Sequence, residues 1–358
     1  MTQKKTQFTI GGKVIQEKGR VFVIAEAGVN HNGDLKKALE LVDVAAAAGA
    51  DAVKFQTFKA EQVVNRYAKM AAYQLKNIGR KMSQQEMLKG LELPESFYST
   101  IMEKCRRRKI IFLSTPHGGN ESAKFLHKLK IRAYKIGSQD LTNYILLELL
   151  AKYKKPLILS SGMSTMDEIK NAISFIRAKG NNNIAVLHCT SNYPCPNEQI
   201  NLRAMVTMMN ELNVQVGFSD HSLGNQVAIM AATLGAAIYE CHFTLDKKLP
   251  GPDHIASCDP DELANRLAAI RNVNIILGSD IKKPTKDELM SMRPLVRKSI
   301  VYVNDFPSGH VIKLADIEAK RPLKGGISPI FYDNFIGKKL IKNVKIDDQL
   351  THYHFKKK

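Results

Sequence analysis

Two histidines in the C-terminal half of the chain are spaced so that they could bind one metal ion. His221 and His242 follow or lie near the end of two consecutive apolar runs, residues 214–220 and 237–243. If the runs are neighbouring strands, they lie roughly 5 Å apart, and two inward-pointing imidazoles converge. Such a pair suits Mn²⁺, Co²⁺ or Zn²⁺, or Mg²⁺ if water and substrate oxygens complete the shell. The alternative is that each histidine is an ordinary hydrogen-bonded polar residue.

Two lysines lie within other apolar runs, Lys54 in residues 52–57 and Lys135 in residues 133–138. A lysine is rarely buried without a partner, so each needs an anion nearby. Hydroxyl groups near the ends of neighbouring runs would help to hold a phosphate or carboxylate. They belong to Thr115, Ser138, Ser160 and Thr190. Two alternatives stay open: each lysine only pairs with an acid, or one forms a Schiff base, as in a class I aldolase.

Three acids are candidates for proton transfer or for orienting other groups. Glu26 and Asp140 lie at or just past the ends of runs, where a general base or acid would sit. Asp140 can instead be a helix N-cap. Glu240 shares a strand face with His242, so it is expected to orient a ligand or to pair with a lysine. Cys241 should face the other way, because side chains alternate along a strand.

The elements that must position these groups are eight short apolar runs, each followed by a helix-like stretch. The runs cover residues 21–26, 52–57, 110–115, 133–138, 156–161, 184–190, 214–220 and 237–243. Such runs, rich in β-branched residues and without strict polar alternation, are typical of buried parallel strands. Eight strand–helix units predict an α/β fold, a (β/α)8 TIM barrel, with its active site at the C-terminal strand ends.

The rest of the chain is assigned around this barrel, which is expected to span residues 1–280. Residues 7–20 predict an N-terminal hairpin that closes the barrel floor. Residues 59–92 form a long connection, which is often a lid or part of a substrate pocket. The polar, proline-punctuated residues 281–294 predict a linker. Residues 295–358 predict a small β-rich domain that leans on a neighbour for stability.

Composition limits the function classes. The apolar fraction of 44% is enough for a packed core, and the net charge is +19. No basic face with interleaved aromatics is evident, so nucleic-acid binding is not expected and the charge is assigned to solubility and attraction of small anions. No membrane span or secretory signal is expected. Five cysteines without CxxC spacing fit a reducing compartment, and a cytoplasmic enzyme is expected.

A series of longer segments, in order along the chain, matches one family. They are IAEAGVNHNGD (24–34), AGADAVKFQTFKA (48–60), AYQLKN (72–77), FLSTP (112–116), YKIGSQD (134–140), LSSGM (159–163), LHCTSNYPCP (187–196), GFSDHS (217–222), HFTLDKKLPGPDH (242–254), VRKSI (296–300) and KRPLKGGISP (320–329). Together they resemble the N-acetylneuraminate (sialic acid) synthase family, including its C-terminal SAF, or antifreeze-like, domain. Members of this family condense phosphoenolpyruvate with an N-acetylated hexosamine.

The resemblance implies three binding sites and a divalent metal, with Mn²⁺ first and Mg²⁺ or Co²⁺ as alternatives. It implies that phosphoenolpyruvate is held by Lys54, Thr115, Lys135, Ser138, Ser160, Ser191 and Ser219, the metal by His221 and His242, and the sugar by Gln56, Tyr193, Asp253 and Arg321. Glu26 and Asp140, with the two lysines, are the implied catalytic residues. The resemblance also implies a domain-swapped homodimer in which Arg321 enters the partner subunit's site, and no nucleic-acid or membrane partner.

The predicted reaction joins phosphoenolpyruvate, N-acetylmannosamine or a close 2-acetamido sugar, and water to give a nonulosonic (sialic) acid and phosphate. An N,N'-diacetyllegionaminate synthase, which uses 2,4-diacetamido-2,4,6-trideoxymannose, is the alternative within this class. A pseudaminate synthase fits the local motifs less well. Outside the class, the alternative is a non-catalytic sugar-binding protein that keeps the barrel and the SAF domain.

The chain departs from the usual family pattern at several positions. SQD (138–140) replaces the SGE of many relatives, so its acid is one methylene shorter. TPH (115–117) replaces TPF, and ECH (240–242) replaces EKH or ERH. The turn RPLKGG (321–326) is one residue longer than the common form, which bears on the reach of its arginine. AYQLKN (72–77) resembles the bacterial subgroup that acts on N-acetylmannosamine or on diacetamido trideoxy sugars.

Overall fold

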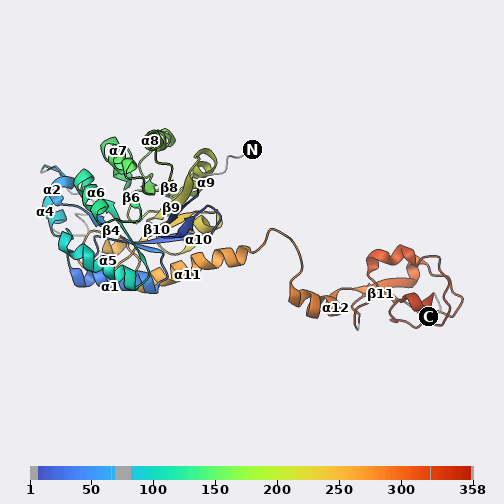
Figure 1. Cartoon of the computed structure of the whole chain (residues 1–358). Coiled ribbons are helices and arrows are strands. Elements are labelled where there is room, and N and C mark those ends of the chain that lie inside the picture. The colour runs from blue at the N-terminus through green and yellow to red at the C-terminus, as the bar shows by residue number, and fades with distance from the viewer. Residues whose placement is uncertain (1–6, 66, 69–81, 323, 356–358) are drawn as a thin grey trace. The chain divides into compact units, whose positions relative to one another are not determined.

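The computed structural model describes residues 7–65, 67–68, 82–322 and 324–355 of the chain. It divides into two compact units, Met1–Gly278 and Ser279–Lys358. In the first unit, eight parallel strands close into a barrel in chain order, and the last strand pairs with the first (Figure 1). The strands are β3 (Phe22–Gly28), β4 (Ala52–Thr57), β5 (Ile111–Pro116), β6 (Tyr134–Ile136), β7 (Leu157–Ser160), β8 (Ile184–Cys189), β9 (Gln215–Asp220) and β10 (Ile238–His242). The predicted (β/α)8 barrel is confirmed.

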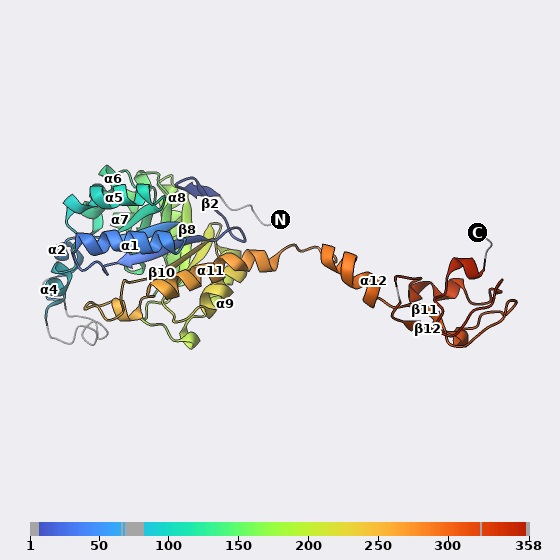
Figure 2. The ribbon, with the colours of Figure 1, turned by 90° about the horizontal axis from the view of Figure 1, so that it is seen from below.

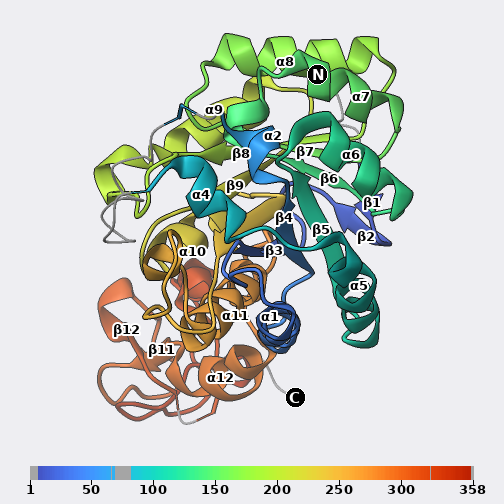
Figure 3. The same ribbon diagram turned by 90° about the vertical axis from the view of Figure 1, so that its left-hand side faces the viewer.

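Helices follow the strands and cover the outside of the barrel (Figure 3). They are α1 (Leu35–Ala47), α5 (Tyr98–Arg107), α6 (Gly119–Lys128), α7 (Tyr144–Lys152), α8 (Met166–Ala178), α9 (Leu202–Glu211), α10 (Gln226–Thr233) and α11 (Pro260–Leu277). The side chains of Thr165 and Asp259 cap α8 and α11 in capping boxes, which satisfy amide groups that the first helical turn leaves free. No helix within the described ranges is long and apolar enough to cross a membrane.

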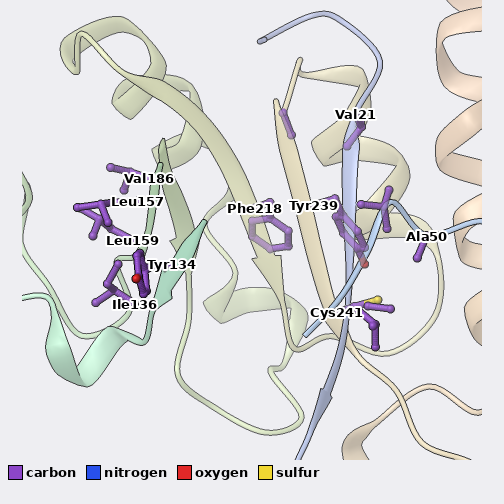
Figure 4. Close-up of a cluster of buried hydrophobic side chains, with 14 of the residues drawn as sticks. Val21, Ala50, Tyr134, Ile136, Leu157, Leu159, Val186, Phe218, Tyr239 and Cys241 are labelled. Carbon is purple, nitrogen blue, oxygen red and sulfur yellow. The ribbon is translucent and has the colours of Figure 1, made fainter. Parts of the chain in front are cut away.

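Alternation of side chains along each strand separates an outer hydrophobic core from the barrel interior. On β10, Tyr239 and Cys241 pack into the core between strands and helices (Figure 4). Glu240 and His242 of the same strand line the cavity inside the barrel. The other strands add side chains to the same outer core, among them Tyr134, Ile136, Leu157, Leu159, Val186 and Phe218. The expected orientation of Cys241 away from His242 is thus confirmed.

The floor of the barrel is apolar and is closed by the N-terminal hairpin. Inward-pointing side chains such as Phe22, Leu113 and Ile158 form a buried cluster. Strands β1 (Phe8–Ile10) and β2 (Lys13–Ile15) pair antiparallel, and their apolar side chains join this cluster. The predicted floor hairpin is therefore present, and polar chemistry is confined to the other end of the interior.

The long connection after β4 lies at the mouth of the barrel. It contains α2 (Ala60–Val63) and α4 (Gln84–Lys89), whereas the motif AYQLKN (72–77) lies outside the described residues. Side chains of both helices pack with Val29 and Phe58 in a small hydrophobic cluster. Figure 2 shows α4 and the hairpin strand β2 at opposite ends of the barrel. The connection is thus placed where it can shape a substrate pocket.

The second unit is built around one antiparallel strand pair, β11 (Ser299–Tyr302) and β12 (Ile317–Lys320). Its separate core consists of Ile300, Tyr302, Ile312, Phe335, Leu340, Val344 and Leu350. Within the expected linker the structure has a helical segment, Glu288–Met292, which continues into α12 (Arg293–Val296). A hydrophobic core of this size contributes little stability, in agreement with the predicted small domain.

Candidate active site

Polar side chains at the C-terminal strand ends surround one cavity of about 330 Å³. Most of the residues singled out in the sequence line it: Glu26, Lys54, Gln56, Thr115, Lys135, Ser138, Ser160, Ser191, Tyr193, Ser219, His221, His242 and Asp253. Strand register brings distant residues together, since Glu26 is paired with Lys54 on one side and with His242 on the other. The carboxyl ends of parallel strands meet at one edge of the barrel, so these groups share one pocket.

Two lysines and two glutamates form a buried ion-pair network in the cavity. Lys54 Nζ lies 2.7 Å from Glu26 Oε2 and 4.0 Å from Glu240 Oε2. Lys135 Nζ lies 3.4 Å from Glu240 Oε1. Glu240 therefore bridges the two ammonium groups, and the predicted pairing of this acid with a lysine is present with both lysines.

Hydroxyl groups complete the surroundings of the two ammonium groups. Lys54 Nζ donates to Thr115 Oγ1 at 3.2 Å, and Lys135 Nζ donates to Ser160 Oγ at 2.6 Å. Ser219 Oγ donates to one oxygen of the bridging Glu240, at 3.3 Å. Ammonium and hydroxyl donors at this spacing can bind an anion with several charge-assisted hydrogen bonds.

Burial and charge set different proton affinities within the network. Burial lowers the pKa of Lys135, and Glu240 only partly offsets this effect. For Lys54, the nearby carboxylates outweigh burial, so its pKa is raised. Burial raises the pKa of Glu26 despite Lys54, whereas the pKa of Glu240 is lowered because the lysines outweigh burial. Glu26 is therefore the carboxylate of this network that takes up a proton more readily.

Two serine hydroxyls converge where the chain leaves β7. Gly162 N donates to Ser138 Oγ at 3.0 Å. A Cβ atom at Gly162 would lie 2.2 Å from Ser191 Oγ and 2.7 Å from Ser138 Oγ. A side chain at this position would displace both hydroxyls, so glycine is required here by close approach.

The histidines at the ends of β9 and β10 face one another across the cavity. The ring centroids of His221 and His242 are 5.5 Å apart. Tyr193 packs against both rings, with centroid distances of 4.0 Å to His221 and 5.6 Å to His242. His221 Nδ1 lies 2.7 Å from the carbonyl oxygen of Thr190, so Nδ1 carries the proton and Nε2 keeps its lone pair.

The two imidazoles fit a divalent metal ion that is completed by other ligands. His242 Nδ1 is buried and has no hydrogen-bond partner within the described part of the chain. Burial, with smaller effects from His221 and the two lysines, holds the pKa of His242 well below its ordinary value, so the ring is in the neutral form that binds metals. No group of three or more His, Cys, Asp or Glu side chains among the described residues is arranged to hold an ion. Water and substrate oxygens would fill the remaining positions.

Because of Asp253, the free energy of unfolding should depend on pH. Burial, with a smaller effect from Glu26, raises its pKa from 3.8 to about 6. The folded state therefore binds more protons than the unfolded state between these values, so stability falls as pH rises through this window. We expect Asp253→Asn to abolish this slope and to raise the free energy of unfolding at neutral pH by up to about 3 kcal/mol. Chemical denaturation across the window tests this, and identical slopes for both proteins would contradict it.

Three expected site residues do not line the cavity: Thr190, Asp140 and Arg321. Thr190 Oγ1 instead donates to the carbonyl oxygen of Gln199 at 3.2 Å. The Asp140 carboxylate accepts hydrogen bonds from Asn143 Nδ2 at 2.9 Å and from Gln139 Nε2 at 3.1 Å. The N-cap of α7 is Asn143, so Asp140 supports the turn that precedes the helix and does not cap it directly. Arg321 lies at an exposed position directly after β12, in the second unit. Leu323, in the same turn, is outside the described residues.

Several lining residues were missing from the expected set. They include His117, Gln139 and Cys189 on or after the strands, and Val63, Gln84, Met87, Leu88 and Leu91 on the long connection. Glu240, which the shared strand face with His242 had singled out, also lines the cavity. For the connection no local pattern indicated which side chains would turn toward the barrel.

A closed barrel with ionisable groups gathered at the C-terminal strand ends defines a (β/α)8 enzyme. Residues 41–282 match the NeuB family and residues 297–356 match the SAF domain. The chain therefore belongs to the NeuB family, whose related proteins include sialic-acid-type synthases.

Relatives of known name cover nearly the whole chain. It is 43% identical over 337 residues to the N,N'-diacetyllegionaminic acid synthase of Legionella pneumophila, which covers 93% of this chain and 94% of that protein. It is 34% identical over 342 residues to the N-acetylneuraminate-9-phosphate synthase of Homo sapiens, with 94% of each chain covered. The crystal structure of an N-acetylneuraminic acid (sialic acid) synthetase from Leptospira borgpetersenii aligns with a TM-score of 0.70 and 31% identity, over 82% of this chain and 97% of that one.

Proposed function

We propose that this protein condenses phosphoenolpyruvate with an open-chain acetamido sugar and water, giving a nine-carbon α-keto acid and phosphate. We favour a 2,4-diacetamido-2,4,6-trideoxy sugar as acceptor, with N-acetylmannosamine as the alternative. The reason is the higher identity to the legionaminic acid synthase, 43% against 34% for the neuraminate-phosphate synthase. This reverses the order that the motifs alone suggested. The observation that carries the proposal is the pair of buried ammonium groups beside two facing histidines in one cavity.

The lysine network supports an anionic donor such as phosphoenolpyruvate. Lys54 and Lys135 present ammonium groups next to the hydroxyls of Thr115 and Ser160. Phosphate and carboxylate oxygens accept strong hydrogen bonds from such donors. Glu240 holds both lysines in the cavity before the donor binds, so little reorganisation is needed on binding.

The histidine side of the cavity supports the acceptor aldehyde. A divalent metal held by His221 and His242 would polarise a carbonyl oxygen as a Lewis acid. Tyr193 packs against both rings and limits their rotation. Gln56 and Asp253 line the same cavity, and we propose that they bind hydroxyl groups of the sugar.

Glu26 is proposed to carry the proton that the reaction must move. The enol carbon of the donor forms a bond to the aldehyde carbon, and water adds to the carbon that bears the phosphate ester. Glu26 takes one proton from this water and passes it to the alkoxide oxygen of the former aldehyde. When the carbon–oxygen bond to phosphate breaks, the oxygen from water becomes the keto oxygen and its second proton leaves with the phosphate. The raised pKa of Glu26 and its position 2.7 Å from Lys54 Nζ support this role.

Release of inorganic phosphate from phosphoenolpyruvate tests the proposal. The purified protein with Mn²⁺ is assayed with N-acetylmannosamine and with the 2,4-diacetamido sugar, and the expected result is phosphate release that depends on sugar. Turnover with pyruvate in place of phosphoenolpyruvate would identify an aldolase instead. Binding of sugar without phosphate release from any combination would indicate a non-catalytic binding protein.

We also propose that Arg321 contacts the sugar, and that it does so in the partner subunit of a domain-swapped homodimer. Arg321→Ala is then expected to raise the sugar KM by about 30-fold, the usual range for losing a hydrogen bond from a charged group. The KM for phosphoenolpyruvate should stay within about twofold, because its proposed contacts lie inside the barrel. Steady-state kinetics with each substrate varied measures both constants, and an unchanged sugar KM would contradict the contact.

Mixed dimers show which subunit supplies the arginine. In a swapped dimer of one Arg321→Ala and one His242→Ala subunit, one active site carries both changes and the other carries neither. When the Arg321→Ala and His242→Ala proteins exchange subunits at random, about half of the dimers are mixed, and each mixed dimer has one intact site. About one quarter of wild-type activity should therefore be recovered. Absence of any recovery after verified subunit exchange would show that Arg321 does not act across the dimer.

A further inference from the structure

His117 and Gln139 meet at the rim of the cavity although they come from different strands. His117 directly follows β5, Gln139 follows β6, and both side chains line the cavity. Gln139 Nε2 lies 2.9 Å from His117 Nδ1 and 3.1 Å from Asp140 Oδ2. An amide nitrogen can only donate, so its two hydrogens go to these two acceptors.

These contacts determine where the hydrogen atoms of His117 lie. Because Nδ1 accepts a hydrogen bond from Gln139, the proton of the neutral ring is on Nε2. Burial lowers the pKa of His117 despite the nearby Asp140, so the ring is neutral at neutral pH. Phe58 packs edge-on against the ring, with the centroids 5.6 Å apart, and limits its rotation. His117 Nε2–H has no acceptor among the described residues and is available to a ligand.

The same contacts orient the Gln139 amide. Its nitrogen is held between His117 and Asp140, and Asp140 is in turn held by Asn143 Nδ2 at 2.9 Å. No described residue donates to Gln139 Oε1, so this oxygen is a free acceptor at the rim. The rim thus presents one oriented N–H donor and one oriented carbonyl acceptor, with Asp140 as a positioning residue behind them.

We infer that His117 and Gln139 bind the second acetamido group of the acceptor sugar. A secondary amide carries one carbonyl acceptor and one N–H donor, which complement His117 Nε2–H and Gln139 Oε1. A hydroxyl group at the same sugar carbon offers one oxygen in place of the separate oxygen and nitrogen of an amide, so it matches this donor and acceptor pair less well. The pair therefore selects a diacetamido sugar over N-acetylmannosamine. This inference rests on the proposed function and identifies residues that set its acceptor specificity.

Substitutions at the two positions test the inference through the ratio of two specificity constants. A low protein yield or a general loss of activity lowers both constants alike and leaves their ratio unchanged. The ratio is kcat/KM for the 2,4-diacetamido sugar divided by kcat/KM for N-acetylmannosamine, measured by phosphate release. His117→Phe keeps an aromatic ring without its donor, and Gln139→Met keeps the length without the acceptor. Each is expected to lower the ratio about tenfold, since each leaves one amide group of the sugar unpaired.

Two further variants serve as matched controls. His117→Gln keeps an N–H donor near the position of Nε2, so its ratio should stay within about threefold of wild type. His127→Phe makes the same change on α6, outside this cavity, and should not change the ratio. The inference is overturned if His117→Phe and Gln139→Met are active with unchanged ratios, or if the wild-type protein shows no preference for the diacetamido sugar. Absence of turnover by the wild-type protein with every sugar would instead refute the proposed function.

Discussion

His242→Ala is expected to reduce phosphoenolpyruvate-dependent phosphate release at least about 1,000-fold. The reason is that two histidines are the proposed protein ligands of the metal ion, and one histidine alone would not hold it. The neutral ring of His242, with its buried and unpartnered Nδ1, lies opposite His221 at a centroid distance of 5.5 Å. The same variant should lose Mn²⁺ binding, measured by titration calorimetry without substrates. This second measurement separates loss of a metal ligand from loss of a general polar contact.

His188 offers a matched control for this substitution. It lies on β8, one residue before Cys189, and its Nε2 is 2.8 Å from the carbonyl oxygen of Ile200, away from the cavity. His188→Gln should retain Mn²⁺ binding and most activity. If His242→Ala still binds Mn²⁺ with wild-type affinity and turns over at near-normal rates, the proposed metal site is wrong.

Lys135→Met is expected to impair both donor binding and folding. Loss of one of two ammonium groups should raise the KM for phosphoenolpyruvate by about 100-fold or more. The substitution also leaves Glu240 with Lys54 at 4.0 Å as its remaining buried cation, so the free energy of unfolding should fall by about 3 kcal/mol. Kinetics with varied phosphoenolpyruvate and chemical denaturation measure the two effects separately. Lys152→Met, at an exposed helix position, should change neither quantity appreciably.

The double variant Lys135→Met/Glu240→Gln distinguishes an anion-binding role from a purely structural ion pair. Removing the unpaired carboxylate should restore most of the lost stability, because no uncompensated charge then remains at that position. Donor binding should stay impaired, because the ammonium group is still missing. Recovery of a normal KM for phosphoenolpyruvate in the double variant would show that Lys135 only neutralises Glu240.

Much of the scaffold could be read from local patterns. Short apolar runs with helix-like stretches between them indicate buried parallel strands, and the strands formed where the runs predicted them. The alternation of side chains along a strand also predicted that His242 and Cys241 would face opposite ways, as they do. These properties depend on the backbone period of two residues and on hydrophobicity, both of which are local.

Contacts between residues far apart in the chain were decided only by the tertiary structure. Glu240 lies between Lys54 and Lys135 because closure of the barrel brings inward-pointing side chains of β10, β4 and β6 together, which no local pattern encodes. The pairing of His117 with Gln139 depends on the register of β5 and β6, which brings together two residues that are 22 positions apart in the chain. Sequence therefore determined which groups enter the barrel mouth, whereas three-dimensional packing determined which of them touch, because side-chain contact depends on strand register and burial together.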